Sequence, residues 1–214
     1  MLSVILTNCK RERDNPPIPD LDAGFSVTNF SKSPILTIRK NSQQDGAAMR
    51  MSYSVDQPEA EIGTTEHFKI DKGFESTFTF SGKAPYYLQI RLFAQDGSLY
   101  NPYGISTAFD QNVFNVGHTQ TNIKTDSLMP SLFDGKKHTV RIQVRNQSES
   151  GLVTTIFVDN LNQAVFEAAD TTAFARKELY GSGPRANRRV SLLFFGNGPA
   201  SGEAMIYDWS FKPL

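Results

Sequence analysis

The sequence predicts an all-β jelly-roll sandwich, and three observations lead to that prediction. Apolar and polar residues alternate over many short segments, which is the period of a strand with one buried face. No segment shows sustained helical periodicity, and only 171–179 is expected to form a turn or two of helix. The 15 glycines and 11 prolines suit many short turns better than long helices. Short strands without a repeat of fixed period indicate a single sandwich domain.

The strand pattern recurs along the whole domain. The expected strands are 25–27, 35–38, 48–55, 67–70, 74–80, 86–95, 139–145, 152–158, 163–167, 190–195 and 204–211. Alternation places Met49, Met51 and Tyr53 on one face of their strand. Trp209 is expected in the core. The stretch 196–199 contains Gly, Asn and Pro, and we expect it to turn a hairpin between the last two strands.

Charge and composition exclude several function classes. The chain has 22 basic and 22 acidic residues, so no long-range field draws it to nucleic acid or to an anionic membrane. A single cysteine and three separated histidines exclude a disulfide, a CxxC redox site and a His/Cys zinc cluster. We expect no cofactor, although a structural calcium site built from carbonyl and carboxylate oxygens stays open.

The first 20 residues differ in character from the rest. A short apolar run ends in Leu6-Thr7-Asn8-Cys9 and is followed by a charge cluster, which resembles the lipobox of a bacterial lipoprotein. That resemblance implies lipidation of Cys9, a lipid anchor as the sole contact with a membrane, and an extracellular or cell-surface location. The apolar run is shorter than that of a complete signal peptide, so a disordered leader with a free thiol is the alternative. Residues 15–20 are proline-rich and predict an extended linker, which leaves 21–214 as the folded domain.

Three segments carry a resemblance to a known superfamily. Residues 134–144, DGKKHTVRIQV, resemble a strand of laminin G-like domains, and 154–160, TTIFVDN, resemble its partner strand. Residues 190–198 and 204–211 are similar to the closing strands of the lectin-like domains attached to bacterial sialidases. The resemblance implies a concanavalin A-like sandwich of two antiparallel sheets. It also implies a glycan ligand on the concave sheet or on the loops at its rim.

The alternation within 139–158 supports this resemblance independently. Apolar Val140, Ile142 and Val144 alternate with polar residues, so the strand has one core face and one polar face. A second strand with a matching apolar face follows after a short turn, which predicts an antiparallel hairpin.

The polar sides of two strands supply the first candidate binding residues. They are Gln89, Arg91, Arg141, Gln143 and Arg145. A guanidinium group held on a rigid strand suits the carboxylate of an acidic sugar, so the partner is expected to be a glycan, with an acidic glycan as one option. The alternative is that these side chains form an ordinary solvated face.

A second candidate site lies in 99–104, LYNPYG, which is expected to form a loop. Tyr100 and Tyr103 could stack on a pyranose ring while Asn101 binds its hydroxyl groups. The alternative is that the two tyrosines pack on their own domain.

The sequence favours a binding protein over an enzyme. Glycosidases need two carboxylates held a few ångströms apart, and jelly-roll hydrolases set them at ExDxxE or ExDxE spacing, which is absent here. We therefore expect a non-catalytic, lectin-like carbohydrate-binding protein. Two alternatives stay open: a glycoside hydrolase or polysaccharide lyase of jelly-roll fold, and a protein-binding adhesin or surface-assembly component.

Overall fold

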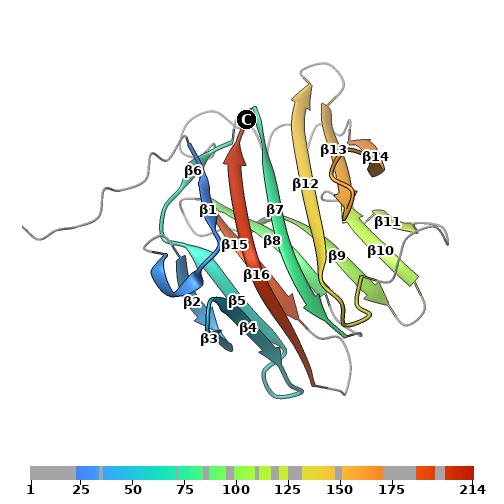
Figure 1. Cartoon of the computed structure of the whole chain (residues 1–214). Helices are drawn as coiled ribbons and strands as arrows, with labels where there is room; N and C mark the ends of the chain where they lie inside the picture. Colours follow the sequence, from blue (N-terminus) through green and yellow to red (C-terminus); the bar gives the residue numbers. More distant parts are fainter. Residues whose placement is uncertain are drawn as a thin grey trace, which may run out of the picture.

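The protein is a sandwich of two antiparallel sheets (Figure 1). The computed structural model describes residues 23–33, 36–70, 72–83, 87–94, 99–108, 111–116, 121–124, 132–147, 151–170, 187–195 and 201–214. These residues form strands β1 to β16 and one short 3₁₀ helix, η1 (Phe30–Lys32). The predicted fold class is therefore confirmed.

The first sheet contains both the first and the last strand of the fold. Its spatial order is β14 (Ala164–Asp170), β13 (Gly151–Val158), β12 (His138–Gln147), β7 (Gly73–Gly82), β16 (Gly202–Pro213), β4 (Ala48–Tyr53) and β3 (Ser42–Asp45). β1 (Phe25–Val27) also pairs with β16.

The second sheet lies behind the first in Figure 1. Its spatial order is β11 (Thr121–Lys124), β10 (Gln111–Val116), β9 (Leu99–Ala108), β8 (Tyr87–Ala94), β15 (Asn187–Phe195), β5 (Glu59–Thr64) and β2 (Leu36–Lys40). The two-residue strand β6 (Phe68–Lys69) also pairs with β15.

The core lies between the two sheets because each sheet turns one apolar face toward the other. Met49, Met51 and Tyr53 of β4 are all buried, as the alternation predicted. Trp209 is fully buried and stands edge-on to Phe25, with ring centroids 5.0 Å apart. The second sheet contributes Ala60, Ile62, Val190, Leu192 and Phe194.

Inside the core, the indole N–H of Trp209 makes a buried hydrogen bond. Its Nε1–H donates to the hydroxyl of Ser76 at 3.0 Å, and that hydroxyl donates to the carbonyl of Ser210 at 3.1 Å. Ser76 is fully buried on the neighbouring strand β7. The serine therefore satisfies the one polar atom of the indole inside an apolar layer.

The predicted hairpin of 139–158 is present as β12 and β13. Val140 lies opposite Val158, Ile142 opposite Ile156, and Val144 opposite Thr154. All of these residues are buried, so the two strands share the core face that the sequence predicted.

The predicted hairpin between the last two strands is wrong. β15 pairs with β5, β6 and β8, whereas β16 pairs with β1, β4 and β7, so the two strands lie in different sheets. Both strands direct an apolar face into the same core. Alternation alone does not distinguish neighbours within one sheet from partners across the core.

The predicted loop 99–104 is also wrong, because it forms the first part of β9. The register with β8 shifts between Ile90, opposite Tyr103, and Leu92, opposite Tyr100. That bulge leaves Asn101 and Pro102 outside the regular pairing. Since proline has no N–H to donate, a bulge allows it to lie within a strand. Strands β3, β5, β10 and β11 were not predicted from the sequence.

Several predictions concern residues that the structure does not describe. These include Cys9, the leader and linker at 1–20, and the helical turn at 171–179. In the described residues, no helix has both the length and the apolar character needed to cross a membrane.

A buried histidine ties the start of β12 to the segments on either side of it. His138 is 7% exposed; its Nδ1 lies 2.9 Å from Asp159 Oδ2 and its Nε2 lies 3.1 Å from Asp134 Oδ1. Carboxylates only accept hydrogen bonds, so both contacts form when the imidazole carries two protons. Burial lowers the pKa of His138, but the bonds to Asp159 and Asp134 outweigh it, and the pKa is raised.

We predict that replacing Ser76 with alanine destabilises the protein by about 1–3 kcal/mol, because the buried Trp209 N–H then has no acceptor. The measurement is the free energy of unfolding in urea. Ser26→Ala, on an exposed position of β1, is the matched control and should change stability by less than about 0.5 kcal/mol. Equal effects of the two substitutions would show that the indole contact contributes nothing.

We also predict that the His138 contacts stabilise the fold at low pH. A pKa raised in the folded state gives stability that is complete below the unfolded value of about 6.5 and is lost as pH rises through the folded value. The test compares urea unfolding of the wild type and His138→Asn at pH 6 and pH 8. The difference between them should shrink at pH 8; a constant difference would contradict the prediction. Burial, together with the nearby Arg189, lowers the pKa of His67, so the contribution of His67 to stability rises with pH. The wild type is therefore compared with the variant, which keeps the His67 contribution and removes that of His138.

Candidate functional site

Three of the predicted binding residues lie on the outer face of the first sheet. Arg141 is half-buried; its guanidinium lies 3.9 Å from the Phe157 ring centroid, and its Nη2 donates to the Leu161 carbonyl. Gln143 donates from Nε2 to Glu75 Oε2 at 2.9 Å. Arg141 and Gln143 thus bind neighbouring groups of their own sheet, and Arg145 alone of the three is exposed.

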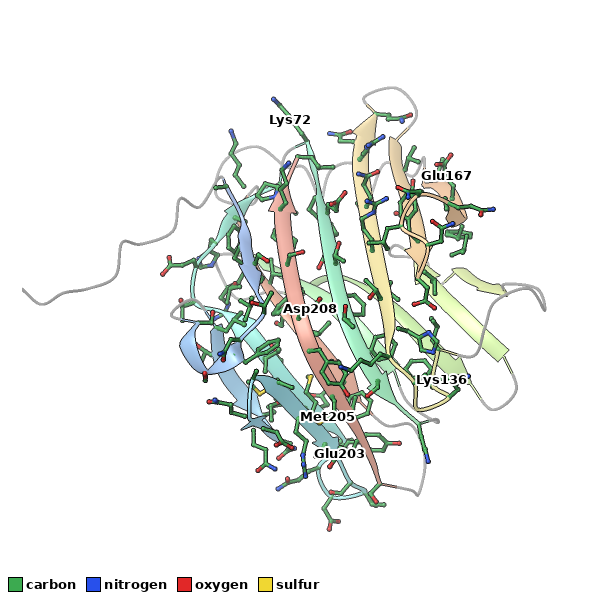
Figure 2. The ribbon with its side chains drawn as sticks, in the orientation of Figure 1. Lys72, Lys136, Glu167, Glu203, Met205 and Asp208 are labelled. Carbon is green, nitrogen blue, oxygen red and sulfur yellow. The ribbon has the colours of Figure 1, made fainter. Side chains whose placement is uncertain are left out.

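Other polar side chains of this face are also paired with one another. The hydroxyls of Thr79 and Thr139 lie 2.9 Å apart, and Ser81 Oγ lies 3.0 Å from Tyr207 Oη. Lys137 Nζ lies 3.8 Å from the Tyr207 ring centroid. Figure 2 shows the polar side chains spread across this sheet from Glu167 on β14 to Asp208 on β16. The face has the character of a hydrogen-bonded solvated surface.

The remaining predicted residues lie in the second sheet. Gln89 and Arg91 are on β8, and Tyr100, Asn101 and Tyr103 are on β9; their side chains lie outside the described part of the structure. The structure therefore divides the eight predicted residues between two sheets. It does not bring them together into one site.

Register places the β8 and β9 residues on different faces of the second sheet. Ile90 lies opposite the core residue Leu192, so the positions of Gln89 and Arg91 alternate onto the outer face. The position of Tyr103 is opposite Ile90, which puts it on the core side. Gln89 and Arg91 thus keep an outward register, Tyr100 and Tyr103 lie opposite core positions, and Asn101 lies in the bulge without a register partner.

The centre of that outer face is buried. Leu193 lies opposite Gln89 on one side and Glu61 on the other, and Ser191 lies opposite Arg91. Their exposed fractions are 0% for Leu193, 6% for Glu61 and 1% for Ser191. These three side chains of the outer face are therefore covered.

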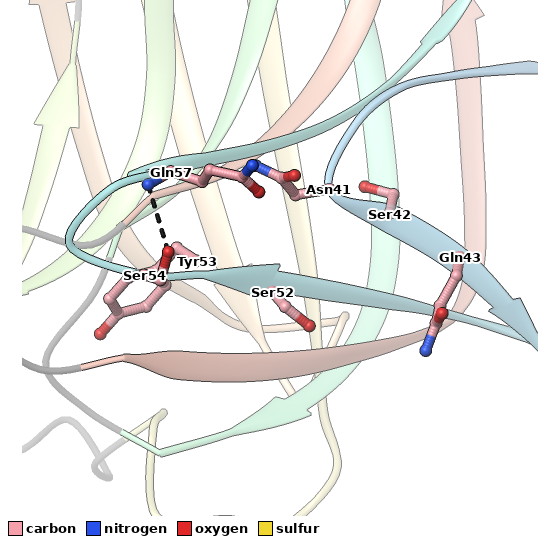
Figure 3. A pocket seen from close by; sticks show the side chains of 7 residues that line it. All are labelled: Asn41, Ser42, Gln43, Ser52, Tyr53, Ser54 and Gln57. Atoms are coloured by element: carbon pink, nitrogen blue, oxygen red, sulfur yellow. Dashed lines mark hydrogen bonds between the residues drawn. The ribbon is translucent and has the colours of Figure 1, made fainter.

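An open pocket lies at the edge of the sandwich where β3, β4 and β5 meet (Figure 3). Its volume is about 310 Å³, at the lower end of the range for small-ligand pockets. The lining consists of three amides, three hydroxyls and one aromatic ring: Asn41, Gln43, Gln57, Ser42, Ser52, Ser54 and Tyr53. All seven side chains are uncharged at neutral pH.

The backbone holds the walls of this pocket in place. Asn41 has φ of +37°, a left-handed conformation that Asn tolerates better than most residues. Its Nδ2 donates to the Glu59 carbonyl at 2.7 Å, and its own carbonyl accepts from Ser52 N at 3.0 Å. Across the pocket, Ser54 N donates to the Gln57 carbonyl at 2.8 Å, which closes the turn between β4 and β5.

Tyr53 links the pocket to the core. The residue is 4% exposed, and its ring centroid lies 5.2 Å from that of Phe194 in the opposite sheet. Burial raises the pKa of the Tyr53 hydroxyl. A Cβ atom at Gly202 on the adjacent β16 would lie 2.4 Å from this ring, so glycine is needed there for the tyrosine to occupy its place.

Three lining side chains carry hydrogen-bonding groups that bond no other described residue. Among the described residues, the side-chain amides of Gln43 and Gln57 and the hydroxyl of Ser52 make no hydrogen bond to the protein. Figure 3 shows Gln57 at one end of the pocket and Gln43 at the other, with Ser52 between them. These groups are therefore available to a polar ligand.

This pocket was not predicted from the sequence. Its residues come from two short stretches, 41–43 and 52–57, that resemble ordinary turns and strand ends. The available signal was that the first stretch, Asn-Ser-Gln, is polar but uncharged. Nothing in the sequence shows that the two stretches meet at one edge.

No protein-family model and no curated protein matches this sequence. Solved structures do match its fold. The Emp47p carbohydrate recognition domain has a TM-score of 0.60 at 11% identity, with 91% of this chain and 99% of that chain covered. The alginate lyase Aly36B, solved with an alginate trisaccharide, has a TM-score of 0.58 at 9% identity, with 91% and 100% covered.

A sialidase gives a TM-score of 0.61 at 14% identity, covering 90% of this chain but 19% of that chain. The match therefore concerns one part of the sialidase. At identities this low, the likeness extends to the fold alone. The chain has the concanavalin A-like jelly-roll sandwich fold that its sequence predicted.

Proposed function

We propose that this protein is a non-catalytic, lectin-like carbohydrate-binding module. The observation that carries the proposal is the open pocket at β3, β4 and β5, whose lining is made of amides, hydroxyls and one ring. The occurrence of the same fold in a carbohydrate recognition domain adds support.

The pocket chemistry matches the surface of a sugar. Each sugar hydroxyl both donates and accepts a hydrogen bond, and a glutamine side chain offers both functions in one planar group. Gln43 and Gln57 present these groups without a competing protein partner among the described residues. A polar ligand that replaced water in this pocket would form hydrogen bonds with these amides in place of those that water forms.

The lining also favours binding over catalysis. Hydrolysis of a glycosidic bond needs two carboxyl groups, one on each side of the bond, and the lining contains none. Glu59 lies next to the pocket, but its carboxylate is paired with Lys40 Nζ. Tyr53 is the one titratable side chain of the lining, and burial moves its pKa further above neutral pH.

A polysaccharide-cleaving enzyme is the second candidate. It is favoured by the buried carboxylate of Glu61 on the outer face of the second sheet, where Gln89 and Arg91 share the outward register. The fold of an alginate lyase is also similar to that of this chain.

The resemblance of residues 6–9 to a lipobox leads to a further proposal, that the protein is exported and anchored at the cell surface through Cys9.

We predict that the purified protein binds glycans on an array and releases no product from them. The array carries neutral and acidic oligosaccharides, and parallel assays follow reducing ends and the absorbance of unsaturated products. Binding without product supports the module. Product release that is lost in Glu61→Gln would establish the enzyme instead. Silence across the array, together with capture of a defined protein partner, would favour an adhesin and contradict the proposal.

A further inference from the structure

We infer that the pocket at β3, β4 and β5 accepts one neutral sugar residue and disfavours acidic sugars, with Gln43 and Gln57 as its specificity-determining residues. This inference rests on the proposed carbohydrate-binding function and names the class of ligand. It differs from the sequence-based option of an acidic glycan held by arginines.

The charged side chains beside the pocket are engaged with one another. Lys40, which precedes Asn41 in the chain, is paired with Glu59. Arg50 lies opposite Gln43 in the register of β3 and β4; it is paired with Asp45, and its Nη1 lies 3.6 Å from Glu203 Oε2. Both described cations therefore already have carboxylate partners.

The balance of these charges is negative. Lys40 and Arg50 supply two positive charges, while Asp45, Glu59 and Glu203 supply three negative ones. Asp56 adds a fourth, because it lies on the exposed turn between Ser54 and Gln57. Among these described side chains, the carboxylate of a uronic or sialic acid would meet no unpaired cation and an excess of negative charge.

A neutral sugar meets a complementary lining. Gln57 from the β4–β5 turn and Gln43 from β3 can each donate to and accept from a hydroxyl, and Ser52 lies between them (Figure 3). The volume of about 310 Å³ suits one small ligand unit better than several. The remaining units of an oligosaccharide would therefore extend from the pocket into solvent.

Asn41 acts as a positioning residue for this site. Its side chain is occupied by the Glu59 carbonyl, and its left-handed backbone sets the direction in which Ser42 and Gln43 leave β2. The left-handed conformation is held by two hydrogen bonds, one that Asn41 donates to the Glu59 carbonyl and one that it accepts from Ser52 N. An uncommon backbone conformation that surrounding contacts hold in place is often found where a binding geometry is fixed in advance.

The test uses matched neutral and acidic probes. Titrations compare methyl galactoside and methyl glucoside with the methyl glycosides of galacturonic and glucuronic acid. Each acidic probe differs from its neutral partner only by a carboxylate in place of the C6 hydroxymethyl group. The same comparison is made with neutral oligosaccharides that bind on the array and their uronic or sialic acid counterparts. We expect the neutral member of each binding pair to bind at least about tenfold more tightly.

Three variants locate the binding. Gln57→Glu and Gln43→Glu each replace an amide donor by a charge, and each should weaken neutral-sugar binding about five- to tenfold or more. Gln163→Glu is the matched control, because Gln163 is exposed near β14, at the opposite edge of the first sheet. Binding by the control and the thermal unfolding midpoints of all three variants should match those of the wild type.

The outcomes separate this inference from the proposed function. Glycan binding that prefers the acidic probes, or that both pocket variants leave unchanged, overturns the inference and keeps the carbohydrate-binding function. The absence of binding to every glycan overturns the proposed function and, with it, the inference.

Discussion

Burial of one face of each sheet in a shared core is the constraint on which the rest of this structure depends. Two sheets of alternating strands can exclude water only by turning their apolar faces toward each other. Here the aromatic side chains of β7 and β16 fill that layer, and the single polar atom of Trp209 is satisfied inside it by Ser76. Any group that binds a ligand must then lie on an outer face or at the rim.

The pocket at the rim depends on the same core. Tyr53 is anchored against Phe194 from the opposite sheet, while its backbone continues into the turn that carries Ser54 and Gln57. Gly202 on β16 leaves the room that this ring needs. Core packing therefore fixes one wall of the pocket, and hydrogen bonds of Asn41 fix another. The amides of Gln43 and Gln57, which bond no other described residue, are carried by this backbone, and a geometry set before binding lowers the entropic cost of binding.

The sequence predicted the fold well where the pattern was local. The β12–β13 hairpin could be predicted because Val140, Ile142 and Val144 alternate within one continuous segment. The separation of β15 and β16 into different sheets could not, since both present an apolar face to the same core. Pro102 also misled, because a bulge opposite Arg91 lets a proline lie within β9. The pocket was missed for a different reason: its uncharged residues become a site only when 41–43 and 52–57 meet in space.

A row of polar side chains on the outer face of a strand does not by itself indicate a binding site. Arg141 and Gln143 form a polar row in the sequence, yet in the structure they contact Phe157, Leu161 and Glu75.

The most direct measurement is an NMR titration of the full chain with a neutral oligosaccharide, following the side-chain amide signals of the glutamines. We predict that the signals of Gln43 and Gln57 shift, while those of Gln143 and Gln163 stay in place. Shifts confined to the signals of Gln89 or Gln143 would contradict the assignment of the pocket as the binding site.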